Sequence, residues 1–127
     1  MRLAASRILA FALLLAAGCA TTGPHPRTGD GRPEIGIASF YDPGLHGERT
    51  ASGKIYDKRE LTAAHRSLPF GTRVRVTNLG NGKTAVLTIT DRGPFVRGRI
   101  LDVSGRAARE LAFQRDGTAR VRLDILQ

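Results

Sequence analysis

Residues 73–95 read RVRVTNLGNGKTAVLTITDRGPF and contain two apolar-polar alternations around a turn signal. The first alternation predicts a strand over 73–78 with one apolar face. Asn81-Gly82 favours a hairpin, because both residues tolerate the positive φ that a primed turn requires. The second alternation returns as the partner strand over 83–90. These residues therefore predict a β-hairpin.

Asp91 follows this second strand and has the same parity as its apolar residues, Ala85, Leu87 and Ile89. Gly93 then permits an unusual backbone conformation, and Pro94 ends the ladder. The strand thus carries a carboxylate to the rim of the fold, where a ligand site can form. The residues alone leave a second interpretation open, in which Asp91 binds loop amides or pairs with Arg92 or Arg99 to fix the turn.

Shorter strands are predicted over 35–41, 99–103 and 119–126. Ser104 can cap a helix whose apolar stripe consists of Ala107, Ala108, Leu111 and Ala112. About six short strands and one helix predict a mostly β domain closed into a small barrel, because closure removes exposed sheet edges. Side chains fill such a barrel, so a site is expected on its rim or in a surface groove.

The first 18 residues have the features of an export signal. Basic residues are followed by 8–17, an uncharged apolar run too short to cross a hydrocarbon core of about 30 Å. We therefore predict a signal peptide over 1–18. The position of Cys19, the only cysteine, resembles a bacterial lipoprotein signal and implies lipidation there, although Ala16 stands where a leucine is usual. A plain signal peptide cleaved nearby and a free cysteine are the alternatives.

The residue after Cys19 is alanine rather than aspartate, which by the same resemblance implies a lipid anchor in the outer membrane, facing the periplasm of the cell envelope. Residues 19–34 have few apolar side chains and predict a flexible tether. The ordered domain is then expected over 35–127.

The chain is basic, with 20 Lys and Arg against 11 Asp and Glu and a formal net charge of +9. Without residues 1–18, 18 basic residues remain and the charge is +7. Nucleic acid is a common partner of such chains, but an exported, membrane-anchored protein rarely meets it, so no nucleic-acid partner is expected. Anionic cell-wall polymer or lipid head groups are the expected partners, and a merely soluble basic surface is the alternative. We expect a monomer; its protein partners stay unassigned.

Four stretches together resemble one family. They are GIASFYD at 36–42, HGERTASGKIYD at 46–57, LTAAHRSLPFGTRVRVTNLGNGK at 61–83 and TDRGPFVRGRILDVS at 90–104. The stretches are similar to those of the RlpA-like lipoproteins, which are double-psi β-barrel proteins of the cell envelope. This resemblance implies a six-stranded double-psi β-barrel with one or two short helices over 35–127.

The resemblance also implies an activity. Active members of the family are lytic transglycosylases that cleave the β-1,4 bond between N-acetylmuramic acid and N-acetylglucosamine in glycan strands stripped of stem peptides. The muramoyl 6-hydroxyl closes a 1,6-anhydro ring, so one carboxyl group can serve as acid and then as base. Asp91 matches the aspartate to which the family assigns this role. No cofactor and no metal site are expected, because three scattered histidines and one cysteine make no metal constellation.

Lys54 departs from the family pattern. Active members have a glutamate there, paired with the aspartate that Asp91 matches. An ammonium beside Asp91 would favour the ionised carboxylate, the opposite of what a general acid needs. Glu48, Glu60 or Asp57 is an alternative second carboxylate, and spacing does not choose among them.

Other residues fit a carbohydrate groove as supporting groups. His65 matches a family residue and, as an imidazole, can hydrogen-bond sugar hydroxyls or Asp57. Arg92 belongs to the DRGPF motif. Aromatic and hydroxyl side chains can contact sugars, yet can equally cover the barrel or serve turns; these are Tyr41, Tyr56, Thr50, Ser52 and Thr62.

Two functions of different classes remain. The first is a peptidoglycan lytic transglycosylase acting in cell-wall remodelling and cell separation, with Asp91 as acid and base. The second is a non-catalytic glycan-binding or scaffolding lipoprotein, similar in logic to expansin-like barrels, and Lys54 is the residue that favours it. Many relatives carry a C-terminal SPOR domain for septal glycan, and none is expected here after the last predicted strand.

Overall fold

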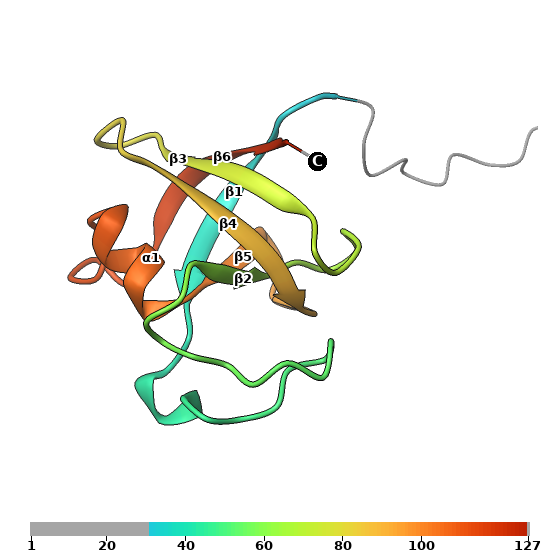
Figure 1. The fold of residues 1–127 in the computed structure, drawn as a ribbon. Coiled ribbons are helices and arrows are strands. Elements are labelled where there is room, and N and C mark those ends of the chain that lie inside the picture. Colours follow the sequence, from blue (N-terminus) through green and yellow to red (C-terminus); the bar gives the residue numbers. More distant parts are fainter. Residues whose placement is uncertain (1–30, 127) are drawn as a thin grey trace, which may run out of the picture.

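The computed structural model describes residues 31–126, which form a closed β-barrel (Figure 1). The described strands are β1 (Glu34–Phe40), β2 (Thr62–Ala64), β3 (Arg73–Asn78), β4 (Thr84–Asp91), β5 (Arg99–Val103) and β6 (Ala119–Ile125). The helices described are the 3-10 helix η1 (Pro43–Leu45) and the α-helix α1 (Gly105–Glu110). The predicted signal peptide and Cys19 lie outside these residues.

The strand order around the barrel is β1-β5-β2-β4-β3-β6, with β6 pairing back onto β1. The β1–β5 and β2–β4 pairs are parallel, and the other four pairs are antiparallel. Each strand therefore has two neighbours and no edge is left open. The predicted mostly β fold and its closure into a barrel are confirmed.

Alternation along the strands builds the core. In β3 the valines are buried and the arginines exposed, and β4 buries Ala85, Leu87 and Ile89 on the same side. The largest fully buried apolar side chains fill the barrel and the space beneath α1, and they are Phe113, Leu68, Leu87, Ile89, Leu101, Leu111, Leu123, Val74, Val76, Val103 and Val121. Because residues 31–126 close a barrel around their own core, this segment meets the requirements for folding by itself.

The β3–β4 hairpin forms as predicted, but its turn differs. Gly82 has φ 76°, whereas Asn81 is not among the residues with positive φ. The N–H of Gly82 donates to the carbonyl of Asn78 at 2.7 Å, and five residues separate the two strands. The predicted primed two-residue turn is therefore wrong, because the Asn78 side chain instead organises a longer loop by accepting from Gly80 N.

Helix α1 begins where Ser104 caps it, with the Ser104 hydroxyl accepting from Ala107 N. The helix ends at Glu110, and Ala112 has φ 55° and is exposed. The predicted apolar stripe thus holds for the other three of its residues but is wrong at Ala112. Strand β2 had no predicted position, because all three of its residues are buried and show no alternation.

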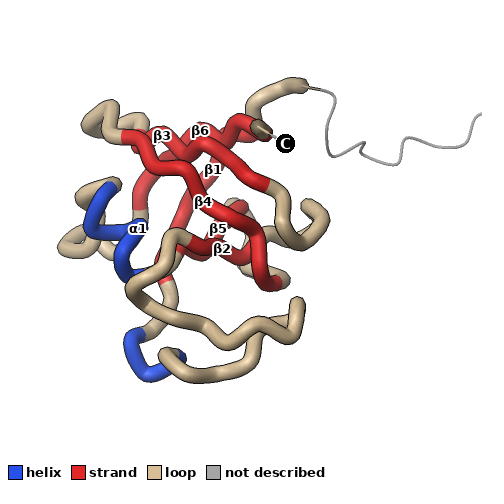
Figure 2. Tube along the Cα trace, viewed as in Figure 1, coloured by secondary structure: helices blue, strands red, loops and turns tan. Residues whose placement is uncertain are grey.

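Residues 41–61 run from β1 to β2 across one end of the barrel, with η1 near their start (Figure 2). An isolated bridge between Arg49 and Ile55 narrows this long loop into a hairpin-like turn. No helix within 31–126 is long and apolar enough to cross a membrane. Asp91, the residue predicted to be catalytic, lies at the end of the barrel that this loop covers.

Candidate active site

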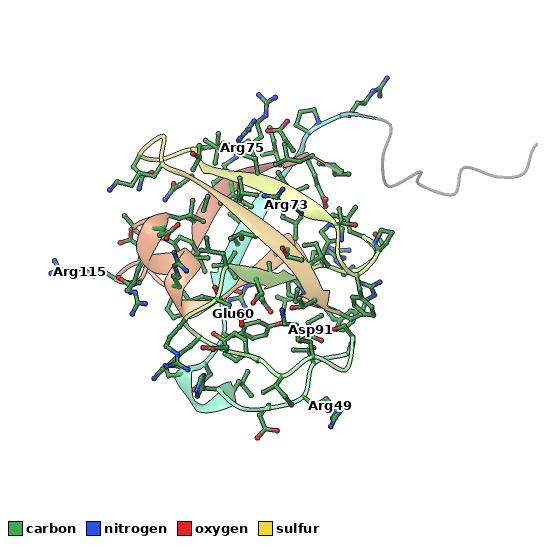
Figure 3. All side chains as sticks on the ribbon, in the orientation of Figure 1. Arg49, Glu60, Arg73, Arg75, Asp91 and Arg115 are labelled. Atoms are coloured by element: carbon green, nitrogen blue, oxygen red, sulfur yellow. The ribbon has the colours of Figure 1, made fainter. Side chains whose placement is uncertain are left out.

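Asp91 ends strand β4 beside the long loop (Figure 3). Strand β2 lies between β4 and β5, and Ala64 pairs with Asp91 on one side and with Asp102 on the other. A register shift between Ala63 and Ala64 places Asp91, rather than Thr90, opposite Ala64. Such irregularities re-aim the side chain that follows, so the backbone of β4 directs Asp91 toward the loop.

Three neutral donors hold the Asp91 carboxylate. Its Oδ1 accepts from the backbone N–H of Ala51 at 2.8 Å and of Arg92 at 2.9 Å. Its Oδ2 accepts from the Tyr41 hydroxyl at 2.7 Å. A carboxylate offers about four acceptor positions, so one position on Oδ2 is left for a ligand. Asp91 is half-buried and makes no ion pair with another described residue.

Tyr41 is hydrogen-bonded to this carboxylate and is close enough to a second one, Asp102, to be affected by its charge. Burial raises the pKa of Tyr41 above its ordinary value, and the hydrogen bond to Asp91 and the charges of Asp91 and Asp102 raise it further. Asp102 lies on β5, where the Ser39 hydroxyl donates to its Oδ1. Asp102 is not among the residues predicted from the sequence. The signal it offers, a carboxylate between buried Leu101 and Val103 in RILDV, is weaker than that of Asp91, because Asp102 does not share their parity.

Lys54, where the resemblance expects a glutamate, does not contact Asp91. Its Nζ lies 3.4 Å from Glu60 Oε2, and both side chains are about half exposed. Asp57 binds Arg59 and lies 3.8 Å from His46 Nδ1, and the hydrogen bonds from Arg59 lower the pKa of Asp57. Within residues 31–126, none of the three alternative carboxylates, Glu48, Glu60 or Asp57, hydrogen-bonds Asp91 or ion-pairs at its site.

His65 has a different set of partners from the predicted ones. Its ring is 4% exposed, and Nδ1 accepts from the backbone N–H groups of Ser67 and Leu68 at 3.1 Å. Since Nδ1 accepts, the ring hydrogen is on Nε2, which lies 2.9 Å from Glu34 Oε2. Both nitrogens are therefore occupied, and the predicted bond to Asp57 is not formed.

Arg92 also holds this neighbouring loop. Its Nη1 donates to the carbonyl oxygens of Leu68 at 2.8 Å and of His65 at 3.3 Å. Its guanidinium stacks on Phe70, with Cζ 4.0 Å from the ring centroid. Of the two turn-fixing contacts that the sequence left open for Asp91, the structure forms the one to backbone amides, those of Ala51 and Arg92. Among the described residues, neither Arg92 nor Arg99 forms an ion pair with its carboxylate.

The predicted hydroxyl groups mainly serve the backbone. Thr50 Oγ1 binds Ser52 Oγ and the Lys54 carbonyl, which closes the turn that presents Ala51 N to Asp91. Ser52 N donates to Thr90 O at 3.3 Å and fixes that turn to β4. Thr62 is 6% exposed within β2. These contacts explain why the loop and Asp91 keep a fixed geometry.

Tyr56 packs against Tyr41, with ring centroids 4.5 Å apart, and its hydroxyl accepts from Gly105 N at 3.1 Å. Burial raises the pKa of Tyr56, and that backbone hydrogen bond partly offsets the effect. No group of three or more His, Cys, Asp or Glu within 31–126 could hold a metal ion.

The chain is similar in sequence to a known protein family and to individual relatives. The lytic transglycolase family model matches residues 34–123. The chain is 56% identical over 92 residues to the probable endolytic peptidoglycan transglycosylase RlpA of Synechocystis sp., covering 72% of this chain and 29% of the relative. It is 46% identical over 96 residues to the endolytic peptidoglycan transglycosylase RlpA of Campylobacter jejuni, covering 76% and 35%. The chain thus spans about a third of these two relatives.

Two solved structures share the fold. The Streptomyces papain inhibitor superposes with a TM-score of 0.62 at 21% identity, covering 76% of this chain and 96% of the inhibitor. The apo expansin of Clavibacter michiganensis gives a TM-score of 0.60 at 22% identity, covering 76% and 51%. The barrel, the motifs and the family match together show that the chain belongs to the RlpA-like lytic transglycolase family of double-psi β-barrel proteins.

Proposed function

We propose that this protein is an endolytic peptidoglycan transglycosylase in which Asp91 is the catalytic acid and base. The observation that supports it most directly is the geometry of Asp91: a half-buried carboxylate held by three fixed, neutral donors, with one acceptor position free on Oδ2. Such positioning is what a proton-transfer residue requires. The relatives named above carry this activity in their names.

The reaction proceeds in two steps on one carboxyl group. Protonated Asp91 gives its proton to the glycosidic oxygen as the bond from muramoyl C1 to that oxygen breaks. The muramoyl 6-hydroxyl then bonds to C1 and loses its proton to Asp91, which returns to the acid form. No water is consumed, and the product ends in 1,6-anhydromuramic acid.

Tyr41 and the Ala51 amide are positioning groups in this scheme. The Tyr41 hydroxyl fixes Oδ2, and the raised pKa of Tyr41 keeps that hydroxyl protonated as a donor at neutral pH. The Ala51 N–H fixes Oδ1 from the long loop. The carboxylate therefore cannot rotate without losing hydrogen bonds, each of which contributes about 1 kcal/mol or more.

The test is product formation. Segment 31–127 is incubated with sacculi from which an amidase has removed stem peptides, and mass spectrometry follows 1,6-anhydromuramoyl ends, with Asp91→Asn as the matched control. We expect product from the wild type and a background signal from Asp91→Asn. Equal signals from both proteins would end the enzymatic proposal.

The second candidate function is non-catalytic glycan binding, and the environment of Lys54 favours it. No second carboxylate contacts Asp91 within 31–126, and the pair that the family resemblance implies is replaced by the Lys54–Glu60 ion pair. Lys54→Glu separates the candidates: a gain of anhydro product identifies the missing carboxylate as the limit on rate. If the wild type forms no anhydro product but is retained on sacculi at moderate salt, the result would support glycan binding without catalysis.

We also propose that Cys19 is lipidated and anchors the domain in the cell envelope, at the outer membrane. The sequence around Cys19 supports this, because an apolar run over 8–17 is followed by Gly18 and then by the only cysteine. Metabolic labelling with a fatty-acid precursor tests it. Label on the full chain that disappears in Cys19→Ala is the expected result, and equal labelling of both contradicts it.

A further inference from the structure

A cleft of about 400 Å³ opens beside Tyr41, on the side of the long loop next to α1. Its volume lies within the range of small-ligand sites. The residues that line it are Phe40, Tyr41, Pro43, Tyr56, Lys58, Gly105, Ala108, Arg109 and Gln114. The reaction proposed for Asp91 does not use any of them except Tyr41.

The walls of the cleft are aromatic. The rings of Tyr41 and Tyr56 pack in a tilted arrangement, with centroids 4.5 Å apart and an interplanar angle of 54°. Phe40 closes the cleft where β1 ends. Aromatic walls of this kind bury the apolar face of a sugar ring or a short aliphatic substituent.

The rim of the cleft is cationic. Lys58 from the long loop and Arg109 from α1 both line it, and no acidic residue does. Neither the Lys58 ammonium nor the Arg109 guanidinium has a hydrogen bond or ion pair with another residue in 31–126. Other cations at this end are already paired, as Lys54 is with Glu60 and Arg59 with Asp57. Two unpaired cations beside aromatic walls favour an anionic ligand that also has an apolar part.

We propose that this cleft binds a carboxylate-bearing substituent of the glycan, next to the sugar that Asp91 acts on. The proposal rests on the proposed function for the identity of the polymer. In peptidoglycan every second sugar carries a lactyl group, whose carboxylate is free in stripped strands and is extended by stem-peptide carboxylates in intact ones. Lys58 and Arg109 contact the carboxylate, and Tyr41 and Tyr56 contact the ring or the methyl group beside it.

Tyr41 is shared by this cleft and the candidate active site. Its ring lines the cleft, while its hydroxyl donates to Asp91 Oδ2. A substituent lodged against that ring therefore lies one side chain away from the carboxylate. A glycan without carboxylates loses the contacts with Lys58 and Arg109 but keeps those with Asp91.

The experiment titrates ¹⁵N-labelled segment 31–127 carrying Asp91→Asn, so that the ligand is not consumed. Three tetrasaccharide probes are used: the alternating glycan with free lactyl groups, the same glycan with stem peptides, and the uncharged N-acetylglucosamine tetramer. The amides of Gly105 and Ala108 report on the cleft, and the amide of Ala51 reports on the surroundings of residue 91. The test variant is the double variant Lys58→Gln, Arg109→Gln. The control is Arg75→Gln, which removes a positive charge from β3, far from the cleft.

We expect the lactyl or the peptide probe to shift Gly105 and Ala108 and to bind more tightly than the uncharged tetramer. The double Lys58→Gln, Arg109→Gln variant should weaken the charged probe about tenfold and leave the tetramer unchanged, since each exposed charge contact contributes a fewfold. Added salt should weaken only the charged probes. The stronger of the two charged probes identifies which carboxylate is bound.

Three results would overturn the proposal. They are equal affinity for charged and uncharged probes, equal weakening by Arg75→Gln, and shifts at Ala51 without shifts at Gly105. The last result would leave the Asp91 chemistry intact. Conversely, the protein could form no anhydro product while the amide of Gly105 shifts with the charged probes and not with the uncharged tetramer. That result would support ligand binding in the cleft and contradict the enzymatic proposal.

Discussion

Asp91 and His65 come from the two strongest motifs of the chain, and the structure places them in contrasting surroundings. Asp91 is half-buried and keeps an acceptor position free, with partners that are all neutral. His65 is buried, and both of its ring nitrogens are occupied by backbone amides and Glu34. Motif membership alone therefore does not tell which side chain can still bind a ligand, whereas burial and unused hydrogen-bonding capacity do: Asp91 keeps an acceptor position and His65 keeps none.

The sharpest test of this contrast is Asp91→Asn measured for both activity and stability. An asparagine keeps an oxygen toward the two backbone N–H groups but cannot transfer the proton, so we expect anhydro product to fall about 10²–10⁴-fold. The free energy of unfolding should change by about 1 kcal/mol or less. Urea unfolding followed by circular dichroism provides the second measurement. A variant that fails to fold would instead make Asp91 a structural residue like His65.

His65→Ala should show the reverse pattern. The change leaves the N–H groups of Ser67 and Leu68 without their acceptor and opens a cavity, so the free energy of unfolding should fall by about 2–4 kcal/mol. Anhydro product per folded molecule should stay within about twofold, because the ring does not reach the site. Ser67→Ala, which keeps the backbone amide, is the control. A loss of product matching that of Asp91→Asn at unchanged stability would assign His65 to substrate contact.

The sequence predicts the parts of this contrast that depend on neighbouring residues, but not those that depend on contacts between residues far apart in the chain. Strands over 73–78 and 99–103 have the predicted bounds because their alternation is local. The position of Asp91 at a strand end was likewise predictable. Its partners were not: Tyr41 lies 50 residues away and Ala51 lies 40 residues away, and only barrel closure brings them together. Strand β2 is too short and too buried to show a period.

The same limit explains the register at the site. Parity along β4 aligns Asp91 with buried Ile89, yet the register shift opposite Ala63 and Ala64 re-aims the end of the strand. A shift of this kind depends on the neighbouring strand and leaves no mark in the alternation. The family resemblance singled out His65 but did not predict its partners, because a motif records residue identity and not which atoms are already hydrogen-bonded.

Tyr41→Phe tests whether fixing Oδ2 matters. The variant loses the hydrogen bond to Asp91 but keeps the ring and the wall of the cleft, so product formation should fall about tenfold. Tyr56→Phe is the matched control, since the Tyr56 hydroxyl accepts from Gly105 N and does not touch Asp91. Its rate should stay within about twofold. Equal losses in the two variants would mean that the tyrosine pair acts through packing alone.

A smaller effect should appear in alkaline solution. The pKa of Tyr41 and that of Tyr56 are raised in the folded protein, mainly by burial. Above the ordinary tyrosine pKa of about 10, the unfolded chain releases protons that the folded protein still holds. Stability is therefore fully present below that pH and falls as pH rises beyond it, by roughly 1 kcal/mol per pH unit after allowing for solvent screening.

Tyrosinate absorbance measures this directly, because these are the only two tyrosines in the chain. The tyrosines of the folded protein should ionise at a higher pH than those of the urea-unfolded protein. Asp91→Asn should reduce this difference in pH, because it removes a charge beside Tyr41. Superimposable titrations of the folded and unfolded states would contradict the buried hydrogen bond between Tyr41 and Asp91.

The smallest effect is expected at Lys54, the residue that departs most from the family pattern. Its ammonium and the Glu60 carboxylate are 57% and 45% exposed, and exposed pairs of this kind contribute about 0–1 kcal/mol. Lys54→Ala should therefore change the free energy of unfolding by less than about 0.5 kcal/mol and the rate of product formation by less than about twofold. Glu60→Ala and the double variant complete a cycle that isolates the pair. A large gain in product from Lys54→Ala alone would show that the Lys54 ammonium lowers the activity of Asp91 without contacting it. The comparison of Asp91 with His65 would then have to include charges beyond contact distance as well as hydrogen-bond partners.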